Sequence, residues 1–259
     1  MISKWKEPWF YYKVIAAAAI LGAIIGVYAY HMIEQKWTRT TDYPFSYWLF
    51  QGNFISYFTY QSNIIVGVYF LIAAIYHNKP NRFLDNQNVR LAITSYITVT
   101  CCTFLIMIIP VAVLAVFKTT ETFNPGVILG AIFFHVVVPA SMIFYTLTHV
   151  TPMKMSATEY YHKSFWLYLI YPLVYTFYLA LRLIVYSTVP SLKSMPLILV
   201  YPYLPGFPDY NVIPHITNNQ LNIVIMAIFF VFVYLGFVGF NFMYFYSIKK
   251  ISQKRPPTR

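Results

Sequence analysis

Charged residues are scarce in this chain. Only 10% of its 259 residues are Asp, Glu, Lys or Arg, and 59% are hydrophobic. Soluble domains carry about 25% charged residues. The composition therefore excludes an ordinary soluble domain and predicts an integral membrane protein. The length leaves room for several spans of about 20 residues each but not for an additional soluble domain, so we expect one membrane domain covering residues 1–259.

Cysteines and acidic residues are also few, and both shortages limit the chemistry. Cys101 and Cys102 are adjacent within a predicted span, where a disulfide between them is geometrically awkward. All seven carboxylates fall outside the predicted spans, which removes proton pumping and paired-carboxylate catalysis inside the bilayer. The sequence has no metal-spaced histidine cluster, phosphate-binding glycine loop or serine elbow, so we expect neither a metal nor a cofactor.

Long apolar runs are what the chain has in abundance. Six of them are long enough to cross a bilayer as helices, so we predict an all-α polytopic membrane protein with six transmembrane helices. The predicted spans cover about residues 12–30, 54–76, 91–117, 126–148, 164–188 and 221–248. No small-residue cleavage site follows the first run, which is therefore expected to remain as a membrane helix.

Basic residues are distributed unevenly between the two sides of these spans. The side that carries both termini has 13 of the 18 Lys and Arg residues, the other side has four, and Arg182 lies inside a span. Because cytoplasmic loops are enriched in Lys and Arg, we place both termini in the cytoplasm. The net charge of +11 follows from this topology and from contact with anionic lipid headgroups, and needs no nucleic-acid partner.

Two longer connections lie on the outer side. Residues 31–53 are rich in Trp and Tyr, which is typical of an aromatic belt at the membrane interface. Residues 189–220 contain a proline-rich stretch that cannot continue a helix, and we expect an irregular lid over the outer mouth.

A small set of polar side chains lies inside the spans at similar depth in the outer half of the membrane. From a rise of about 1.5 Å per residue, Thr59 is about 10 Å deep, His135 about 14 Å and Arg182 about 9 Å. Helical spacing adds two faces: Thr59, Ser62 and Asn63 on one, and Tyr171, Tyr175, Tyr178 and Arg182 on the other. Since polar groups that face lipid are costly, we expect both faces to turn inward.

Each of these residues also has a purely structural interpretation. A threonine in a membrane helix usually bonds its own preceding turn, and a histidine or asparagine often bridges two helices. Arg182 could extend to the outer headgroups, and the tyrosines could serve for packing. It is the common depth of the residues that favours a joint functional site.

Four segments, taken together, resemble one known family. They are residues 54–66, residues 135–139, residues 166–175 followed by Arg182, and the Tyr-Pro-Tyr sequence at 201–203. In this order they resemble the androgen-induced and androgen-dependent six-span membrane proteins, which hydrolyse fatty acid esters of hydroxy fatty acids. The similarity covers roughly residues 50–245 and is closer to little-characterised bacterial relatives, which implies a bacterial plasma membrane.

The resemblance implies a nucleophile and a base. In this family a span threonine is the nucleophile and a span histidine its base, and the motif positions fall here on Thr59 and His135. The substrate would be a lipid ester from the bilayer. The candidate substrate-binding or oxyanion residues are Ser62, Asn63, Tyr178 and Arg182. The separation between His135 and Pro139 is one residue shorter than in the animal proteins, so the type of ester carries over less directly.

The implied chemistry also follows from the residue types. A hydroxyl is a weak nucleophile until a base takes its proton, and His135 is the single imidazole inside the predicted spans. With no span carboxylate, a tyrosine hydroxyl, an asparagine carbonyl or the backbone must orient the ring, and we expect slower catalysis than by a full triad.

Two functions of other classes also fit the sequence. One is a transporter or channel that binds an anionic solute at His135 and Arg182, although the sequence lacks an internal repeat that would favour it. The other is a non-catalytic lipid-binding membrane protein, which a loss of activity in Thr59→Ala with intact folding would exclude.

Overall fold

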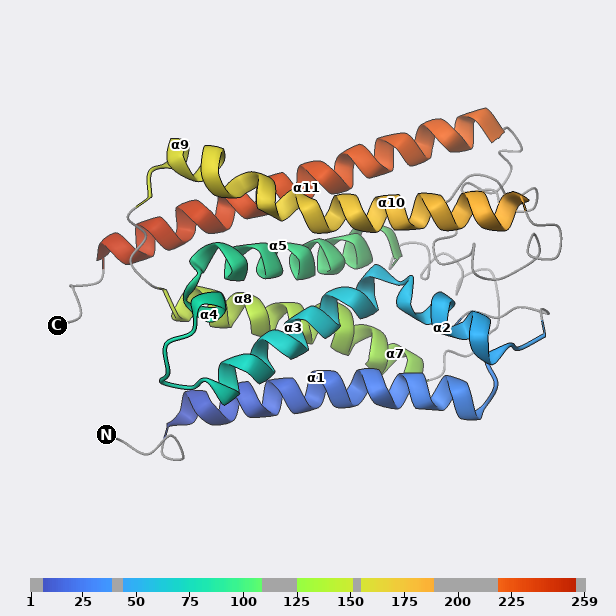
Figure 1. Ribbon diagram of the computed structural model, residues 1–259, viewed down its shortest axis with the longest axis horizontal. Helices are drawn as coiled ribbons and strands as arrows, with labels where there is room; N and C mark the ends of the chain where they lie inside the picture. The colour runs from blue at the N-terminus through green and yellow to red at the C-terminus, as the bar shows by residue number, and fades with distance from the viewer. Residues whose placement is uncertain (1–6, 39–43, 109–124, 151–154, 189–218, 255–259) are drawn as a thin grey trace.

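The computed structural model describes residues 7–38, 44–108, 125–150, 155–188 and 219–254. Over these ranges the chain forms helices that lie side by side along the long axis of the molecule (Figure 1). Six helices in the described part of the chain are long and apolar enough to cross a membrane. The predicted all-helical fold with six helices of transmembrane length and apolarity is thereby confirmed.

The elements follow one another with short connections. The first half of the chain contains α1 (Pro8–Ile33), α2 (Tyr47–Ile55), α3 (Phe58–Ile75), α4 (Arg82–Asp85), α5 (Gln87–Thr103) and the π-helical turn η2 (Phe104–Ile108). The second half contains α7 (Pro125–Ile132), η3 (Phe133–Val137), α8 (Val138–Thr148), α9 (Ala157–Tyr160), η4 (Tyr161–Phe165), α10 (Trp166–Thr188) and α11 (Asn219–Lys254). The end of the third predicted span and nearly all of the predicted outer lid lie outside the described residues.

The second predicted span, residues 54–76, overlaps two helices, the end of α2 and the whole of α3. α2 ends at Ile55, Ser56 keeps helical backbone angles, and the backbone becomes extended at Tyr57 before α3 starts. The segment read as the first outer loop therefore contains a helix of its own, α2. Trp48 on this helix is 88% exposed, as expected for an interfacial aromatic residue.

α5 lies at the centre of the bundle, with buried hydroxyl side chains that bond to the surrounding helices. Thr94 meets Thr146 of α8 at 2.8 Å, and Thr98 meets Tyr244 of α11 at 2.8 Å. These bonds satisfy polar groups that have no water to bind in a membrane interior.

α1 packs closely against α3 through Gly67. A Cβ atom at this position would lie 2.7 Å from the Cδ2 atom of Leu21, so a side chain there would force the two helices apart or displace Leu21. The glycine therefore sets the distance between these two helices, as small residues do in membrane bundles.

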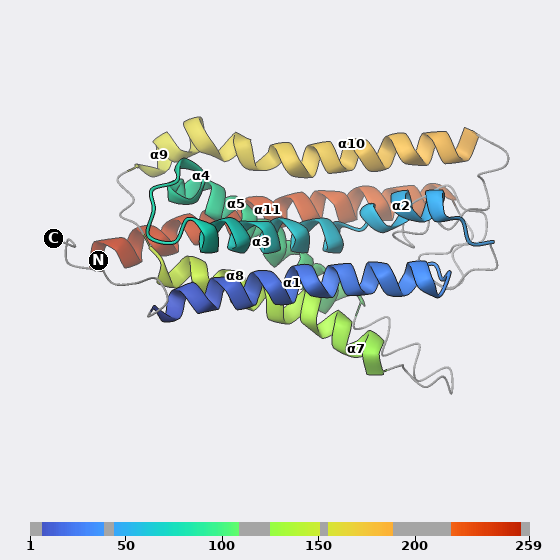
Figure 2. The same ribbon diagram turned by 60° about the horizontal axis from the view of Figure 1, so that its bottom comes forward.

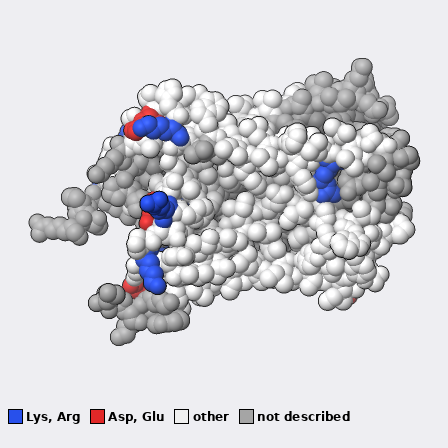
Figure 3. Space-filling view, viewed as in Figure 1, with Lys and Arg blue, Asp and Glu red and all other residues white. Residues whose placement is uncertain are grey.

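The end of the bundle that carries the chain termini is rich in basic residues. The start of α1 and the end of α11 lie at the same end of the molecule (Figure 1), and the Lys and Arg side chains visible in Figure 3 gather mainly there. Lys13 and His77 are buried at this end, with Lys13 Nζ 2.9 Å from His77 Nδ1 and His77 Nε2 3.0 Å from a Glu7 carboxylate oxygen. Lys13 is thus part of a buried network rather than a solvated loop cation.

Candidate functional site

Thr59 lies in the first turn of α3, directly after the helix break. Tyr57 is the residue that precedes the helix, and the first bond of the helical ladder runs from the Gln61 N–H to the Tyr57 carbonyl, at 3.1 Å. The backbone N–H groups before Gln61 stand outside that ladder, as at every helix N-terminus. Thr59 is half-buried. The break therefore places the Thr59 hydroxyl close to backbone N–H groups that are outside the helical ladder, within an otherwise apolar bundle.

His135 lies in the π-helical turn η3, and Pro139 explains this turn. Proline has no N–H group, so residue 139 cannot donate to the His135 carbonyl as an α-helix requires. The Val138 N–H bonds instead to the Phe133 carbonyl, which widens the turn. Such turns are frequent at functional sites. The elements α7, η3 and α8 follow one another as one continuous rod. Figure 2 shows that α8 lies beside α1, whereas α7 leads away from α1.

Thr59 and His135 are in direct contact. The Thr59 Oγ1 atom lies 3.1 Å from His135 Nε2, and His135 Nδ1 lies 2.9 Å from the carbonyl oxygen of Ala131. A carbonyl only accepts, so Nδ1 carries the proton and Nε2 is left to accept from the threonine hydroxyl. The ring of Phe104 stacks on the imidazole at 4.2 Å. The pair thus has the geometry and the tautomer that a hydroxyl nucleophile and its base require.

The threonine hydroxyl bonds across helices, so the purely structural interpretation of Thr59, in which it bonds its own preceding turn, does not describe this residue. The sequence left a tyrosine hydroxyl, an asparagine carbonyl or the backbone as the group that orients the imidazole. In the structure this group is the backbone carbonyl of Ala131. Neither the identity of this carbonyl nor the stacking of Phe104 carried a recognisable signal in the sequence.

Asn63 connects the two halves of this pair. Its amide nitrogen donates to the Thr59 carbonyl at 2.7 Å and to the Phe134 carbonyl at 3.2 Å. Both amide hydrogens are thereby used, and the residue is fully buried. Asn63 ties the first turn of α3 to the residue next to His135, a holding role rather than that of the predicted oxyanion donor.

Ser62 has a similar role towards another helix. Its hydroxyl lies 2.9 Å from the hydroxyl of Thr100 on α5 and 3.1 Å from the Thr59 carbonyl. The side chain is buried. The predicted face of Thr59, Ser62 and Asn63 does turn into the bundle, with Thr59 contacting His135 and the other two contacting neighbouring helices.

Tyr178 and Arg182 form a second group, at the end of α2. Arg182 Nη1 donates to the Gly52 carbonyl and to the Tyr178 hydroxyl, and the Tyr178 hydroxyl lies 3.1 Å from the Ser56 hydroxyl. His135, by contrast, bonds Thr59 and Ala131. In the part of the chain that the structure describes, the two members of the alternative anion site thus belong to different hydrogen-bonded groups.

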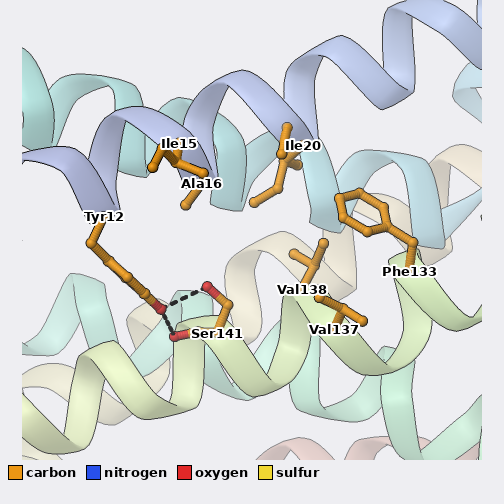
Figure 4. Close-up of a pocket in the computed structure, with 9 residues that line it drawn as sticks. Tyr12, Ile15, Ala16, Ile20, Phe133, Val137, Val138 and Ser141 are labelled. Carbon is orange, nitrogen blue, oxygen red and sulfur yellow. Dashed lines mark hydrogen bonds between the residues drawn. The ribbon is translucent and has the colours of Figure 1, made fainter.

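An apolar groove of about 240 Å³ lies between α1 and the η3–α8 rod (Figure 4). Phe133 and Val137 line it together with Ile20, and a Tyr12–Ser141 hydrogen bond of 2.7 Å stands among its lining residues. His135, midway between Phe133 and Val137, contacts α3 instead. The groove is therefore a surface separate from the Thr59–His135 pair.

Comparisons with known proteins give one similarity. The chain is 29% identical over 206 residues to an uncharacterised protein of Mycoplasma genitalium, MG452, an alignment that covers 77% of this chain and 70% of that protein. No family model and no solved structure matches the chain.

Proposed function

We propose that the chain is an intramembrane threonine hydrolase that cleaves lipid esters, such as fatty acid esters of hydroxy fatty acids. The observation that carries the proposal is the contact between Thr59 Oγ1 and the unprotonated Nε2 of His135. The resemblance of the surrounding segments to the androgen-induced hydrolase family supports the same two residues and the same substrate class.

The residues present account for both halves of an ester hydrolysis. The Thr59 oxygen attacks the ester carbonyl carbon while His135 Nε2 takes the hydroxyl proton. His135 then returns this proton to the departing oxygen, which releases the hydroxy fatty acid and leaves an acyl group on Thr59. A water molecule next attacks the acyl-threonine, again giving its proton to His135, and the fatty acid leaves as the threonine hydroxyl forms anew.

The charge that develops on the carbonyl oxygen needs hydrogen-bond donors. With Asn63 and Ser62 committed to backbone and α5, the N–H groups of Thr59 and Tyr60 in the first turn of α3 are the candidate donors. The positive end of the helix dipole adds to their effect. In well-studied hydrolases one such donor contributes about 100-fold to 1000-fold in rate.

The site lies in the half of the bundle away from the chain termini. With both termini in the cytoplasm, as the excess of basic residues at that end favours, Thr59 and His135 face the outer leaflet of a bacterial plasma membrane. A lipid ester with two long chains would reach the site laterally, because its acyl chains already reside in that leaflet.

The test is hydrolysis of a fatty acid ester of a hydroxy fatty acid by the purified protein in detergent. We expect activity in the wild type and a loss of at least about 100-fold in both Thr59→Ala and His135→Ala, with unchanged thermal unfolding. Absence of wild-type activity on a panel of lipid esters would contradict the proposal and favour solute or lipid binding instead.

A further inference from the structure

The break between α2 and α3 releases carbonyl groups inside the membrane. The carbonyls of Asn53 and Phe54 accept from the N–H groups of Ser56 and Tyr57 in a turn, at 3.1 and 3.3 Å. The carbonyls of Gly52, Ile55 and Ser56 remain to be satisfied by other groups. No water is at hand in a bilayer interior, so a break here requires donors from elsewhere in the protein.

Side chains supply a donor to each of these three carbonyls. Gly52 accepts from the Ser56 hydroxyl at 2.6 Å and from Arg182. Ile55 accepts from the Gln61 amide at 2.7 Å, and Ser56 accepts from the Tyr175 hydroxyl at 2.7 Å. The carbonyl groups of residues 52–56 are therefore all hydrogen-bonded.

Two of these donors, Tyr175 and Arg182, lie on one face of α10, and the other two, Ser56 and Gln61, bond to tyrosines of that face. Tyr171, Tyr175, Tyr178 and Arg182 are spaced four, three and four residues apart and share a helical face. Tyr171 reaches the break indirectly, because its hydroxyl donates to the Gln61 side chain at 2.9 Å. The face that the sequence predicted to be inward is thus directed at the helix break.

The hydrogen bonds along this face have one consistent direction. Arg182 donates to the Tyr178 hydroxyl, Tyr178 donates to the Ser56 hydroxyl, and Ser56 donates to the Gly52 carbonyl. Each hydroxyl in the chain gives one proton and accepts one bond. Gly52 permits the approach, since a Cβ atom there would lie 3.0 Å from Arg182 Nη1.

We propose that Tyr175, Tyr178 and Arg182 are positioning residues for the nucleophile. They hold the α2–α3 break open, and the break sets Thr59 in the first turn of α3, three residues beyond Ser56, within reach of His135. The proposal rests on the hydrolase function proposed above. It replaces the sequence-based role of Tyr178 and Arg182 as direct oxyanion donors.

The experiment compares Tyr175→Phe and Tyr178→Phe with a matched control, Tyr234→Phe. Tyr234 also bonds to α10, through Thr176 at 2.8 Å, but away from the break. Two readouts are taken: hydrogen–deuterium exchange of residues 52–61, and kcat and KM for ester hydrolysis. We expect faster exchange over that segment and a fall in kcat of about tenfold to 100-fold, because small misplacements of a nucleophile cost that much.

Several features distinguish positioning from general destabilisation. KM and the pH profile should stay within experimental error of the wild type, because the substitutions leave His135 and its bonds to Thr59 and Ala131 in place. Tyr234→Phe should change neither exchange over residues 52–61 nor kcat by more than about twofold. Arg182→Lys, which keeps a donor and the charge, should retain more activity than Arg182→Met.

The two readouts also separate this proposal from the hydrolase itself. Unchanged exchange in both tyrosine variants would overturn the positioning role whatever the activities are. If the tyrosine variants exchange faster but the wild type hydrolyses no ester, the hydrolase function is refuted. The three residues would then stabilise the break without a role in catalysis. Equal losses of kcat in Tyr234→Phe and Tyr178→Phe would also count against positioning.

Discussion

The proposed chemistry depends on the hydroxyl group of Thr59. Serine carries the same hydroxyl without the methyl group, so Thr59→Ser should keep the contact with His135. We expect Thr59→Ser to retain at least about a tenth of the wild-type rate, whereas Thr59→Ala loses at least about 100-fold. Equal, complete inactivity of both variants in the hydrolysis assay would show that the residue acts through its shape rather than its hydroxyl.

Asn63 ties the first turn of α3 to the residue next to His135. Asn63→Leu keeps the number and branching of the side-chain heavy atoms but leaves the Phe134 carbonyl without its side-chain donor in a buried position. We expect a loss of about 1–3 kcal/mol in the free energy of unfolding and slower hydrolysis. Thermal unfolding in detergent measures the stability, and the hydrolysis assay measures the rate. An unchanged unfolding midpoint would mean that the Asn63 hydrogen bonds contribute nothing to stability.

At the scale of single elements, the π-helical turn at His135 is tied to Pro139. Pro139→Ala restores an N–H group, which lets the turn relax to an α-helix and rotates His135 away from Thr59. We expect hydrolysis to fall at least tenfold by this misplacement while the protein stays as stable as the wild type or becomes more so. Full activity in this variant would contradict the role assigned to the turn.

The contact of α1 with α3 offers a stability test that is independent of function. Gly67→Val inserts a side chain where Leu21 leaves no room, whereas Gly239→Val on α11 places the same side chain in open space. We expect the first variant to be less stable than the second by about 1–3 kcal/mol, since overpacking costs that much. Equal unfolding midpoints would show that the helices separate without strain.

The sequence predicted the elements better than their interruptions. Six apolar helices and the inward face of α10 follow from length, apolarity and spacing, whereas the pairing of Thr59 with His135 comes from the resemblance to a known family. The break at Tyr57 does not, because neither Ser56 nor Tyr57 is a proline or glycine. In addition, the Gly52 and Ser56 carbonyls accept from Arg182 and Tyr175 of α10, which is distant in sequence. The missing N–H group of Pro139 is evident from its residue type, but the choice of a π-helical turn is not.

At the scale of the whole molecule, topology is the first expectation to check. Single cysteines are introduced at Lys36, between α1 and α2, and at Lys79, after α3, in a background without Cys101 and Cys102. A membrane-impermeant maleimide should label Lys36→Cys in intact cells and Lys79→Cys only after permeabilisation, because basic residues favour the cytoplasmic side for Lys79. The reverse pattern would place the Thr59 site in the inner leaflet.

The buried network at the opposite end of the bundle concerns stability rather than catalysis. Lys13→Met removes the partner of His77 and leaves the Glu7–His77 pair without its second contact. We expect a lower unfolding midpoint, from a loss of about 1–3 kcal/mol, with kcat unchanged. A fall in kcat at equal stability would instead connect this end to the site.

The most direct measurement is the mapping of a covalent adduct by mass spectrometry after incubation with an alkyl fluorophosphonate, which reacts with activated hydroxyl nucleophiles. A phosphonate on Thr59 in the wild type, absent in His135→Ala, is the predicted result. An unmodified Thr59, or equal modification of Thr59 with and without His135, would contradict the proposed nucleophile and base.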